Sequence, residues 1–144
     1  DMDWRYSVNS DWALSGLVNY VRGERDDIDD NLYRIAPLNG SLALDYTGDR
    51  WGARLEARLY AEQDKVSATN NEQESDGYGL LNVGGYWLAT DHLRVAVGID
   101  NLMDENYADH VSGVNRVMGN PDIASGERLP GYGRNAFLRL DVSL

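Results

Sequence analysis

Residues 48–62 read GDRWGARLEARLYAE, and apolar and polar side chains alternate along most of this stretch. From residue 51 onward, one side carries Trp, Ala and Leu, and the other carries Arg, Glu and Tyr. A period of two is typical of a β-strand, since successive side chains leave opposite faces, whereas a helix would scatter these charges around its circumference. We therefore predict a strand with one dry face and one charged face.

The same alternation recurs along the chain and predicts seven strands in all. The other six expected strands are residues 2–9, 12–22, 38–47, 81–87, 93–100 and 135–144. The sequence contains no convincing helical period. These features predict an all-β fold, an antiparallel up-and-down meander.

The connections between the expected strands alternate between short and long. The short connections are 10–11, 48–49 and 89–91, and the long ones are 23–37, 63–77 and 101–133. Alternate links of a meander lie at the same end, so short turns form one rim and long loops form the other. Outer-membrane barrels have this asymmetry, and strands of about 9–11 residues suit a tilted membrane crossing.

Aromatic residues agree with a membrane barrel. Trp12, Trp51 and Trp87 adjoin the three short turns on the apolar face, and Tyr20 lies near the other end of its strand. Such residues form girdles at the two membrane boundaries. A soluble lipocalin-like barrel that binds a small ligand is the alternative, since its strands alternate in the same way. Seven strands are an odd number, whereas bacterial outer-membrane barrels have even numbers, so we expect the chain to be a fragment of a longer sheet.

Composition excludes several other classes. The net charge of −11 argues against nucleic acid as a partner, because binding phosphates needs clustered Lys and Arg. The chain has no cysteine and no apolar run long enough for a transmembrane helix. No leader precedes Asp1, so a signal peptide is expected to be absent or already removed.

Residues 97–110, VGIDNLMDENYADH, resemble a signature near the carboxyl end of TonB-dependent outer-membrane receptors. Residues 126–144 resemble the closing Pro-Gly-Arg stretch and last strand of that family, and residues 31–46 are also similar to it. The matching motif positions are Asp100, Asn101, Leu102, Asp104, Tyr107, His110, Pro130, Gly133 and Arg134. Two positions depart from the family: Met103 replaces a Phe, and the chain ends in Leu144 where an aromatic residue is usual.

The resemblance implies that residues 1–144 are the carboxyl-terminal strands of a 22-stranded transmembrane barrel, without its plug domain. It implies a receptor-transporter of the Gram-negative outer membrane that takes up a metal chelate (an iron-siderophore or copper) or a similar scarce nutrient. The implied partners are outer-membrane lipid and lipopolysaccharide, the extracellular chelate, TonB only through the missing plug, and the barrel-insertion machinery at the final strand. No cofactor is expected.

The long loops are acidic. They hold 14 acidic and 5 basic residues, which places −9 of the total charge of −11 on them. A solvated acidic surface explains this charge. A sharper alternative is cation binding by Asp26, Asp27, Asp29 and Asp30, whose oxygens suit Ca²⁺, but their spacing does not match an EF-hand.

His110 is the candidate metal ligand, together with Asp109 and Met118 in the same loop. Imidazole and thioether suit copper. The alternative is that His110 is a structural residue that fixes the loop over the rim. His92 adjoins a short turn and is expected to be interfacial.

The chain is not expected to be an enzyme, and no catalytic residue is assigned. Neither a G-x-S-x-G elbow nor an H-E-x-x-H site is present. Ser112 near His110 would need a positioned acid and an oxyanion hole. Glu56 and Asp45 alternate with arginines, which predicts an ion-pair ladder. An outer-membrane hydrolase remains the enzymatic alternative.

Overall fold

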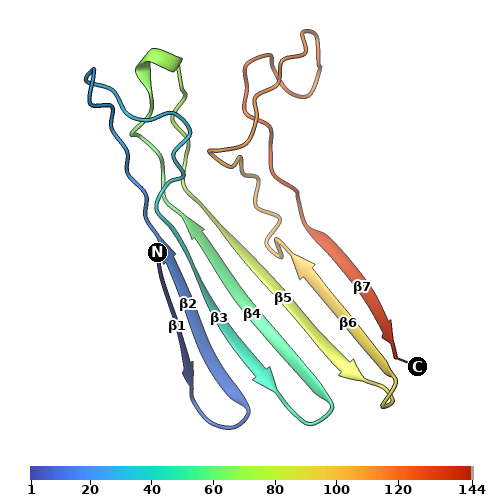
Figure 1. Ribbon diagram of the computed structural model, residues 1–144. Helices are drawn as coiled ribbons and strands as arrows, with labels where there is room; N and C mark the ends of the chain where they lie inside the picture. Colours follow the sequence, from blue (N-terminus) through green and yellow to red (C-terminus); the bar gives the residue numbers. More distant parts are fainter. Residues whose placement is uncertain (144) are drawn as a thin grey trace.

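Seven antiparallel strands form one sheet in the computed structural model, which describes residues 1–143 (Figure 1). The strands are β1 (Met2–Ser7), β2 (Trp12–Asn19), β3 (Asn39–Thr47), β4 (Trp51–Tyr60), β5 (Tyr78–Leu88), β6 (Leu93–Asp100) and β7 (Asn135–Val142). Each strand pairs with the next in sequence, which confirms the predicted meander. A single 3-10 turn, η1 (Ala68–Asn70), is the only helical element in this part of the chain, and no helix in it is long and apolar enough to span a membrane. Leu144, expected in the last strand, lies outside the described residues.

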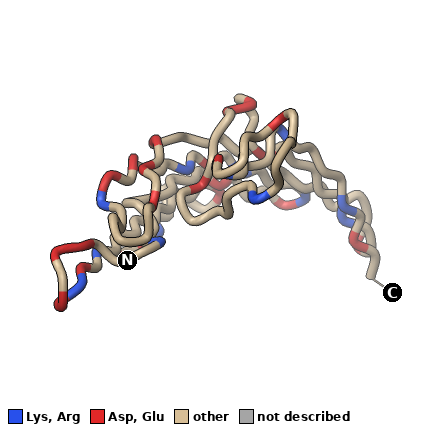
Figure 2. Tube along the Cα trace, turned by 90° about the horizontal axis from the view of Figure 1, so that it is seen from above, with Lys and Arg blue, Asp and Glu red and all other residues tan. Residues whose placement is uncertain are grey.

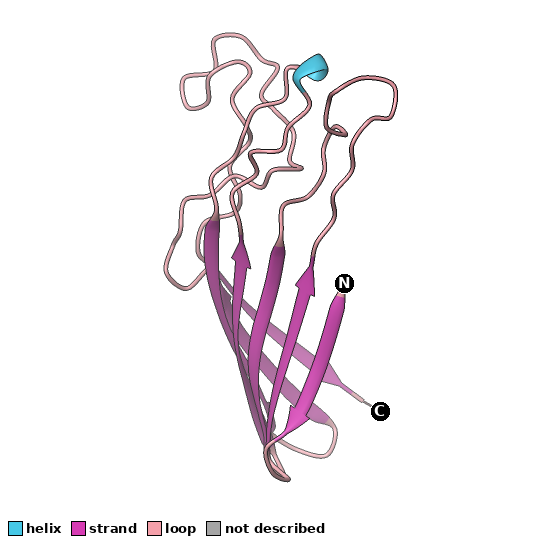
Figure 3. Ribbon diagram, turned by 90° about the vertical axis from the view of Figure 1, so that its left-hand side faces the viewer, coloured by secondary structure: helices cyan, strands magenta, loops and turns pink. Residues whose placement is uncertain are grey.

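The short and long connections lie at opposite ends of the sheet, as predicted (Figures 1 and 3). Residues 8–11, 48–50 and 89–92 make the turns, at what we call the turn rim. At the other end, the loop rim, lie the first long loop (20–38), the second (61–77) and the third (101–134).

Several strand limits differ from the sequence prediction, among them the end of β1, which is Ser7 rather than residue 9. β2 ends at Asn19 rather than residue 22, because its partner β3 begins at Asn39, opposite Asn19. β5 begins at Tyr78 rather than residue 81, because Tyr78 pairs with Tyr60 of β4.

Cross-strand register gathers the large apolar side chains on one face. Leu44 lies opposite Leu55, Leu55 opposite Val83, and Val83 opposite Ile99. We call this side the apolar face, and the side that carries Asp45 and Arg54 the polar face. No other described element covers the apolar face, and Leu55 at its centre is 44% exposed.

The polar face lies on the inside of the curved sheet. Seen from above, the sheet forms an open arch (Figure 2). All the buried residues of the strands are small and lie on the polar face: Ala13, Ala43, Gly52, Ala96 and Gly98. Crowding of this kind is expected on the inner side of a curved sheet, where neighbouring side chains converge. The apolar face is therefore the outer one.

Aromatic rings cluster on the apolar face at the turn rim. The ring centroid of Tyr46 lies 4.9 Å from that of Trp12 and 4.3 Å from that of Trp51. Trp51 also lies directly opposite Trp87 in the β4–β5 register. The expected girdle of tryptophans at this rim is therefore present.

Within the described residues, the outer edges of β1 and β7 are unpaired. The ladders run from β1–β2 to β6–β7, and none joins β7 back to β1. The sheet is thus open, as expected for a part of a larger barrel.

Candidate functional site

A ladder of ion pairs crosses the polar face. Asp45 accepts hydrogen bonds from Arg5 at 3.1 Å and from Arg54 at 2.9 Å, and Arg54 also bonds Glu56 at 3.1 Å. Arg58 completes the series, 3.2 Å from Glu56. The expected ion-pair ladder is confirmed, and both carboxylates are already neutralised by guanidinium groups.

At the loop rim, the three long loops meet at the buried carboxylate of Glu72, in the second loop. One Glu72 oxygen accepts the backbone N–H of Arg34 from the first loop at 2.8 Å. The same oxygen lies 3.2 Å from Nε2 of His110 in the third loop, and the other oxygen accepts the N–H of Ser67 at 2.8 Å. One side chain therefore binds all three loops.

The His110 ring lies between two side chains of the second loop. Its Nδ1 lies 2.9 Å from the Ser75 hydroxyl oxygen and its Nε2 faces Glu72. Burial, and then the nearby Arg128 guanidinium, lower the pKa of His110, and these effects outweigh the opposing charge of Glu72. A neutral ring that donates from Nε2 to the carboxylate must accept at Nδ1, so the Ser75 hydroxyl donates to it.

Two arginines brace the same junction through backbone carbonyls. Arg34 donates to the carbonyl of Val111, which joins the first loop to the third. Arg128 donates to the carbonyl of His110 and, at 2.8 Å, to that of Gln73, which joins the third loop to the second. These contacts are charge-assisted hydrogen bonds, the stronger kind.

Asp30 links the first loop to the second. Its carboxylate accepts the Ser67 hydroxyl and the Ala68 N–H, both at 2.8 Å, and also the hydroxyl and N–H of Thr69. The Thr69 hydroxyl is the main cause that holds the pKa of Asp30 well below its usual range. The calcium hypothesis loses support here, since Asp30 is occupied by protein donors and Asp27 pairs with Arg25.

The family-like residues close the base of the third loop. Asn101 is buried with a left-handed φ of 51°, and its amide donates to the carbonyls of Glu105 at 2.9 Å and Tyr132 at 3.2 Å. Asp104, with φ of 58°, accepts the Arg134 N–H at 2.8 Å, and this bond is the first cause of its lowered pKa. These side chains hold the ends of β6 and β7 together.

The remaining motif residues have structural places as well. Asp100 pairs with Asn135 across β6 and β7, and the N–H of Leu102 donates to the Leu81 carbonyl. Tyr107 ends a stack of three rings that begins with Tyr60 and Tyr78, with centroid distances of 4.5 Å at each step. Pro130 lines the cleft described next, and a side chain added at Gly133 would lie 3.3 Å from Asp104.

An open acidic cleft of about 700 Å³ lies between the second and third loops. Arg128 is its only lining cation among the described residues, and that group is engaged with carbonyls. Its acidic lining residues are Glu62, Asp64, Glu74, Asp76, Glu105, Asp122 and Glu127. This cleft will attract cations and repel anions.

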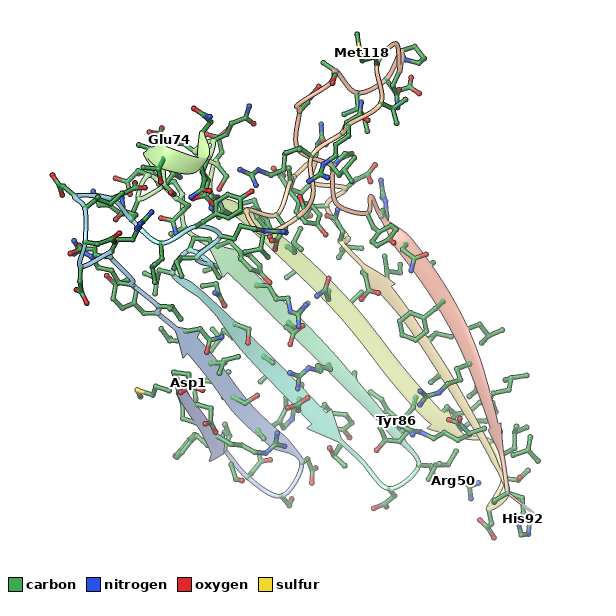
Figure 4. The ribbon with its side chains drawn as sticks, turned by 45° about the horizontal axis from the view of Figure 1, so that its top comes forward. Asp1, Arg50, Glu74, Tyr86, His92 and Met118 are labelled. Atoms are coloured by element: carbon green, nitrogen blue, oxygen red, sulfur yellow. The ribbon has the colours of Figure 1, made fainter. Side chains whose placement is uncertain are left out.

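The three candidate metal ligands do not converge. Asp109 accepts the Tyr78 hydroxyl at 3.0 Å and the Val111 N–H at 2.9 Å, and both ring nitrogens of His110 have partners. Met118 is 88% exposed near the tip of the third loop (Figure 4). In residues 1–143, no group of three or more His, Asp or Glu is placed to hold a metal ion. Metal binding by His110, Asp109 and Met118 stays a prediction, and His110 would first have to leave a partner.

The hydroxyl beside His110 is that of Ser75, not the Ser112 considered from the sequence. Ser112 donates to the Leu129 carbonyl at 3.2 Å. Ser75, His110 and Glu72 are hydrogen-bonded in the order serine, histidine, carboxylate that a hydrolase triad has. Ser75, however, lines the acidic cleft. Carboxylates there oppose the oxyanion that acyl transfer develops, so we assign this chain of bonds to loop structure.

Solved structures with similar folds cover nearly the whole chain. The copper transporter OprC matches 99% of it with a TM-score of 0.92 and 23% identity. The ferric enterobactin receptor PfeA from Pseudomonas aeruginosa, in complex with enterobactin, matches 97% with a TM-score of 0.73 and 19% identity. The chain spans only 23% and 21% of the lengths of these two proteins. At such identities the likeness shows the fold alone.

Sequence comparison assigns the family. No curated protein matches the chain closely enough to count as a relative. The sequence profile described as "TonB dependent receptor-like, beta-barrel" matches residues 1–102, which is most of the chain and includes β1 to β6. The chain therefore belongs to the TonB-dependent receptor family and forms part of its β-barrel.

Proposed function

We propose that this chain is a wall segment of an outer-membrane receptor-transporter that takes up a metal chelate. The observation that carries the proposal is the placing of the two faces: a wide apolar face lies outside the arch, and a charged face lies inside. A lipid-embedded barrel around a wet interior needs this order. A lipocalin-like carrier needs the reverse, with the apolar face as its core.

The two rims then take opposite sides of the membrane. Short turns of outer-membrane barrels face the periplasm and long loops face the outside. The Trp12, Tyr46 and Trp51 cluster marks the inner boundary, and the acidic loops meet the surroundings and lipopolysaccharide. The open edges of β1 and β7 pair with further strands of the same barrel, because unpaired backbone groups are costly in hydrocarbon.

We further assign the cargo to the copper or iron-siderophore class. The names of the similar structures, a copper transporter and a ferric enterobactin receptor, support this class. Within this class, the acidic cleft favours a copper cation over ferric enterobactin, because an iron ion bound by three catecholate groups forms a negatively charged complex. We assign energy coupling through TonB to a plug domain that lies outside residues 1–144. We place residues 1–144 themselves at the carboxyl-terminal end of the barrel.

Uptake by cells tests the proposal. A strain without this receptor is compared with one that carries the full-length protein, using radioactive copper and ferric enterobactin. Accumulation of one cargo should need both the receptor and a functional TonB. The Glu74→Gln, Asp76→Asn double variant, which removes two charges from the acidic cleft, should weaken uptake at low cargo concentration. Equal accumulation of both cargoes with and without the receptor would contradict the assigned cargo class.

A further inference from the structure

A second hollow, of about 400 Å³, lies on the polar face, and its lining residues Thr47, Gly52 and Arg94 adjoin the turn rim. Its charge is opposite to that of the loop cleft. Asp45 is its only lining carboxylate among the described residues. Its four cationic lining residues, from four different strands, are Arg5, Arg54, Arg94 and Arg139.

The floor of this hollow is made of backbone. Gly84 of β5 pairs with Gly98 of β6, and a side chain added at Gly84 would meet only backbone atoms, the nearest at 3.4 Å. Aromatic rings flank the floor: Tyr86 covers Gly52, and Phe137 covers Gly98, each within 2.5 Å of where a Cβ atom would be. Gly84 therefore leaves an open space that guanidinium groups surround.

Two of the four arginines already hold an oxyanion. Arg5 and Arg54 share the carboxylate of Asp45, at 3.1 and 2.9 Å. Arg94 and Arg139 have spare capacity. The Arg94 guanidinium lies 4.3 Å from the centre of the Tyr86 ring and has no carboxylate within ion-pair distance in residues 1–143. Within residues 1–143, Arg139 bonds Asp141 through Nε only, at 3.2 Å, so its two terminal amino groups have no partner there. Asp141 itself lies opposite Arg94 in the β6–β7 register.

Arg94 and Arg139 are also close enough to act together. Arg139 lies opposite Ala96, two residues from Arg94 on the same face of β6, so the two arginines are diagonal neighbours across a small side chain. Stacking on Tyr86 holds the Arg94 guanidinium in place before any ligand arrives, which lowers the entropy lost on binding.

We propose that this hollow binds a small oxyanion with at least two negative charges, of the phosphate or dicarboxylate class, between Arg94 and Arg139. Forked guanidinium donors match the paired oxygens of such anions. Because the hollow opens on the polar face, the anion would lie between the barrel wall and the plug. This site is independent of the cargo assigned to the loops, and each can fail without the other.

Isothermal titration of the full-length protein in detergent with inorganic phosphate, and separately with succinate, tests the proposal at constant chloride concentration. We expect saturable binding of one or both probes to the unaltered protein. The Arg94→Gln, Arg139→Gln double variant should bind about ten-fold more weakly or worse, as expected for lost charge-assisted hydrogen bonds. Arg58→Gln is the matched control, because Arg58 lies on the same face outside the hollow and should leave binding unchanged.

Three results would overturn the proposal. The first is that neither probe binds saturably. The second is that Arg58→Gln weakens binding as much as the double variant does, which would mean only a general attraction to the charged face. The third is that the protein's own carboxylates fill the hollow. Arg94→Lys tests this directly. If a carboxylate from another part of the polypeptide fills the hollow, carbodiimide treatment should form an amide bond between that carboxylate and the introduced lysine. With an empty hollow, mass spectrometry should find no such cross-link to a residue outside 1–143.

Discussion

His110 and Glu72 lie in different long loops, and Nε2 of the histidine is 3.2 Å from a carboxylate oxygen of the glutamate. Their side chains are only 1% and 4% exposed, although the rim around them is open to solvent. A buried carboxylate with several donors is costly to disturb, because each donor left without a partner loses a hydrogen bond that water cannot replace. This pair is the centre of the loop rim.

Removing the Glu72 carboxylate should loosen all three long loops. Glu72→Ala leaves two backbone N–H groups and the His110 ring without their acceptor, at about 1–3 kcal/mol for each buried group. Hydrogen exchange of the full-length protein in detergent should show faster exchange in residues 20–38, 61–77 and 101–134. Glu74→Ala, an exposed change in the same loop, is the control (Figure 4). Faster exchange in residues 61–77 alone would contradict the shared junction.

Acidification should loosen the same junction through His110. Its pKa in the folded protein is lowered below the ordinary value of 6.5, so the unfolded loop binds a proton more readily than the folded one. The loop contacts are therefore fully stable above about pH 6.5 and lose stability as the pH falls through the lower folded pKa. Exchange rates of residues 101–134, corrected for the intrinsic pH effect, should rise in acid, and His110→Gln should remove that rise. Greater protection in acid would refute the neutral ring.

Metal titration separates the two roles considered for His110. Because both ring nitrogens already have protein partners, His110→Ala in the full-length receptor should leave copper affinity unchanged and alter loop order. Met118→Leu is the companion variant, since its thioether is exposed and free of these contacts. Loss of copper binding in both variants would instead establish them as ligands.

A charge at Leu55 should destabilise the barrel. The residue lies midway along β4 on the apolar face, and Leu55→Arg should cost about 2–4 kcal/mol in the full-length protein, the range for a cation at the lipid midplane. Removing the neighbouring charge by Arg54→Leu should cost only about 0–1 kcal/mol, since Asp45 keeps Arg5 and Glu56 keeps Arg58. Reversible unfolding in detergent by urea measures both, and equal costs would argue against lipid on this side.

Cysteine accessibility decides what covers the apolar face. A probe attached through Leu55→Cys should be quenched by a lipid-phase quencher, and the free thiol should resist a water-soluble reagent. The same change at Arg54 should give the opposite pattern, because that side chain points into the wet interior. Protection of the Leu55 position from both reagents would mean that protein packs there, and the membrane assignment would be wrong.

Sequence alone predicted the strands because their pattern is local. The alternation around Leu55 fixes which face each residue takes, and pairing then places Arg54 beside Asp45 without further information. The start of β5 was missed because Gly79 and Leu80 break the alternation, with glycine on the apolar face and leucine on the polar face.

The loop rim was harder to predict, because its contacts join residues far apart in sequence. Nothing local connects Ser75 or Glu72 with His110, at separations of 35 and 38 residues. Proximity in sequence suggested Ser112 and Met118 as neighbours of His110, and neither contacts its ring in the described structure. The one available signal was His110 itself, which matches the family motif. It indicated where the loops meet but not which residues contact the ring.

The junction at Glu72 has a consequence for chimeric receptors. A graft of residues 61–77 alone into another barrel would carry a buried carboxylate away from the Arg34 backbone and the His110 ring that satisfy it. Its new neighbours would have to supply equivalent donors, so most single-loop exchanges should misfold at the rim. Recombination that alters recognition in such a barrel is therefore expected to exchange the loops as a set.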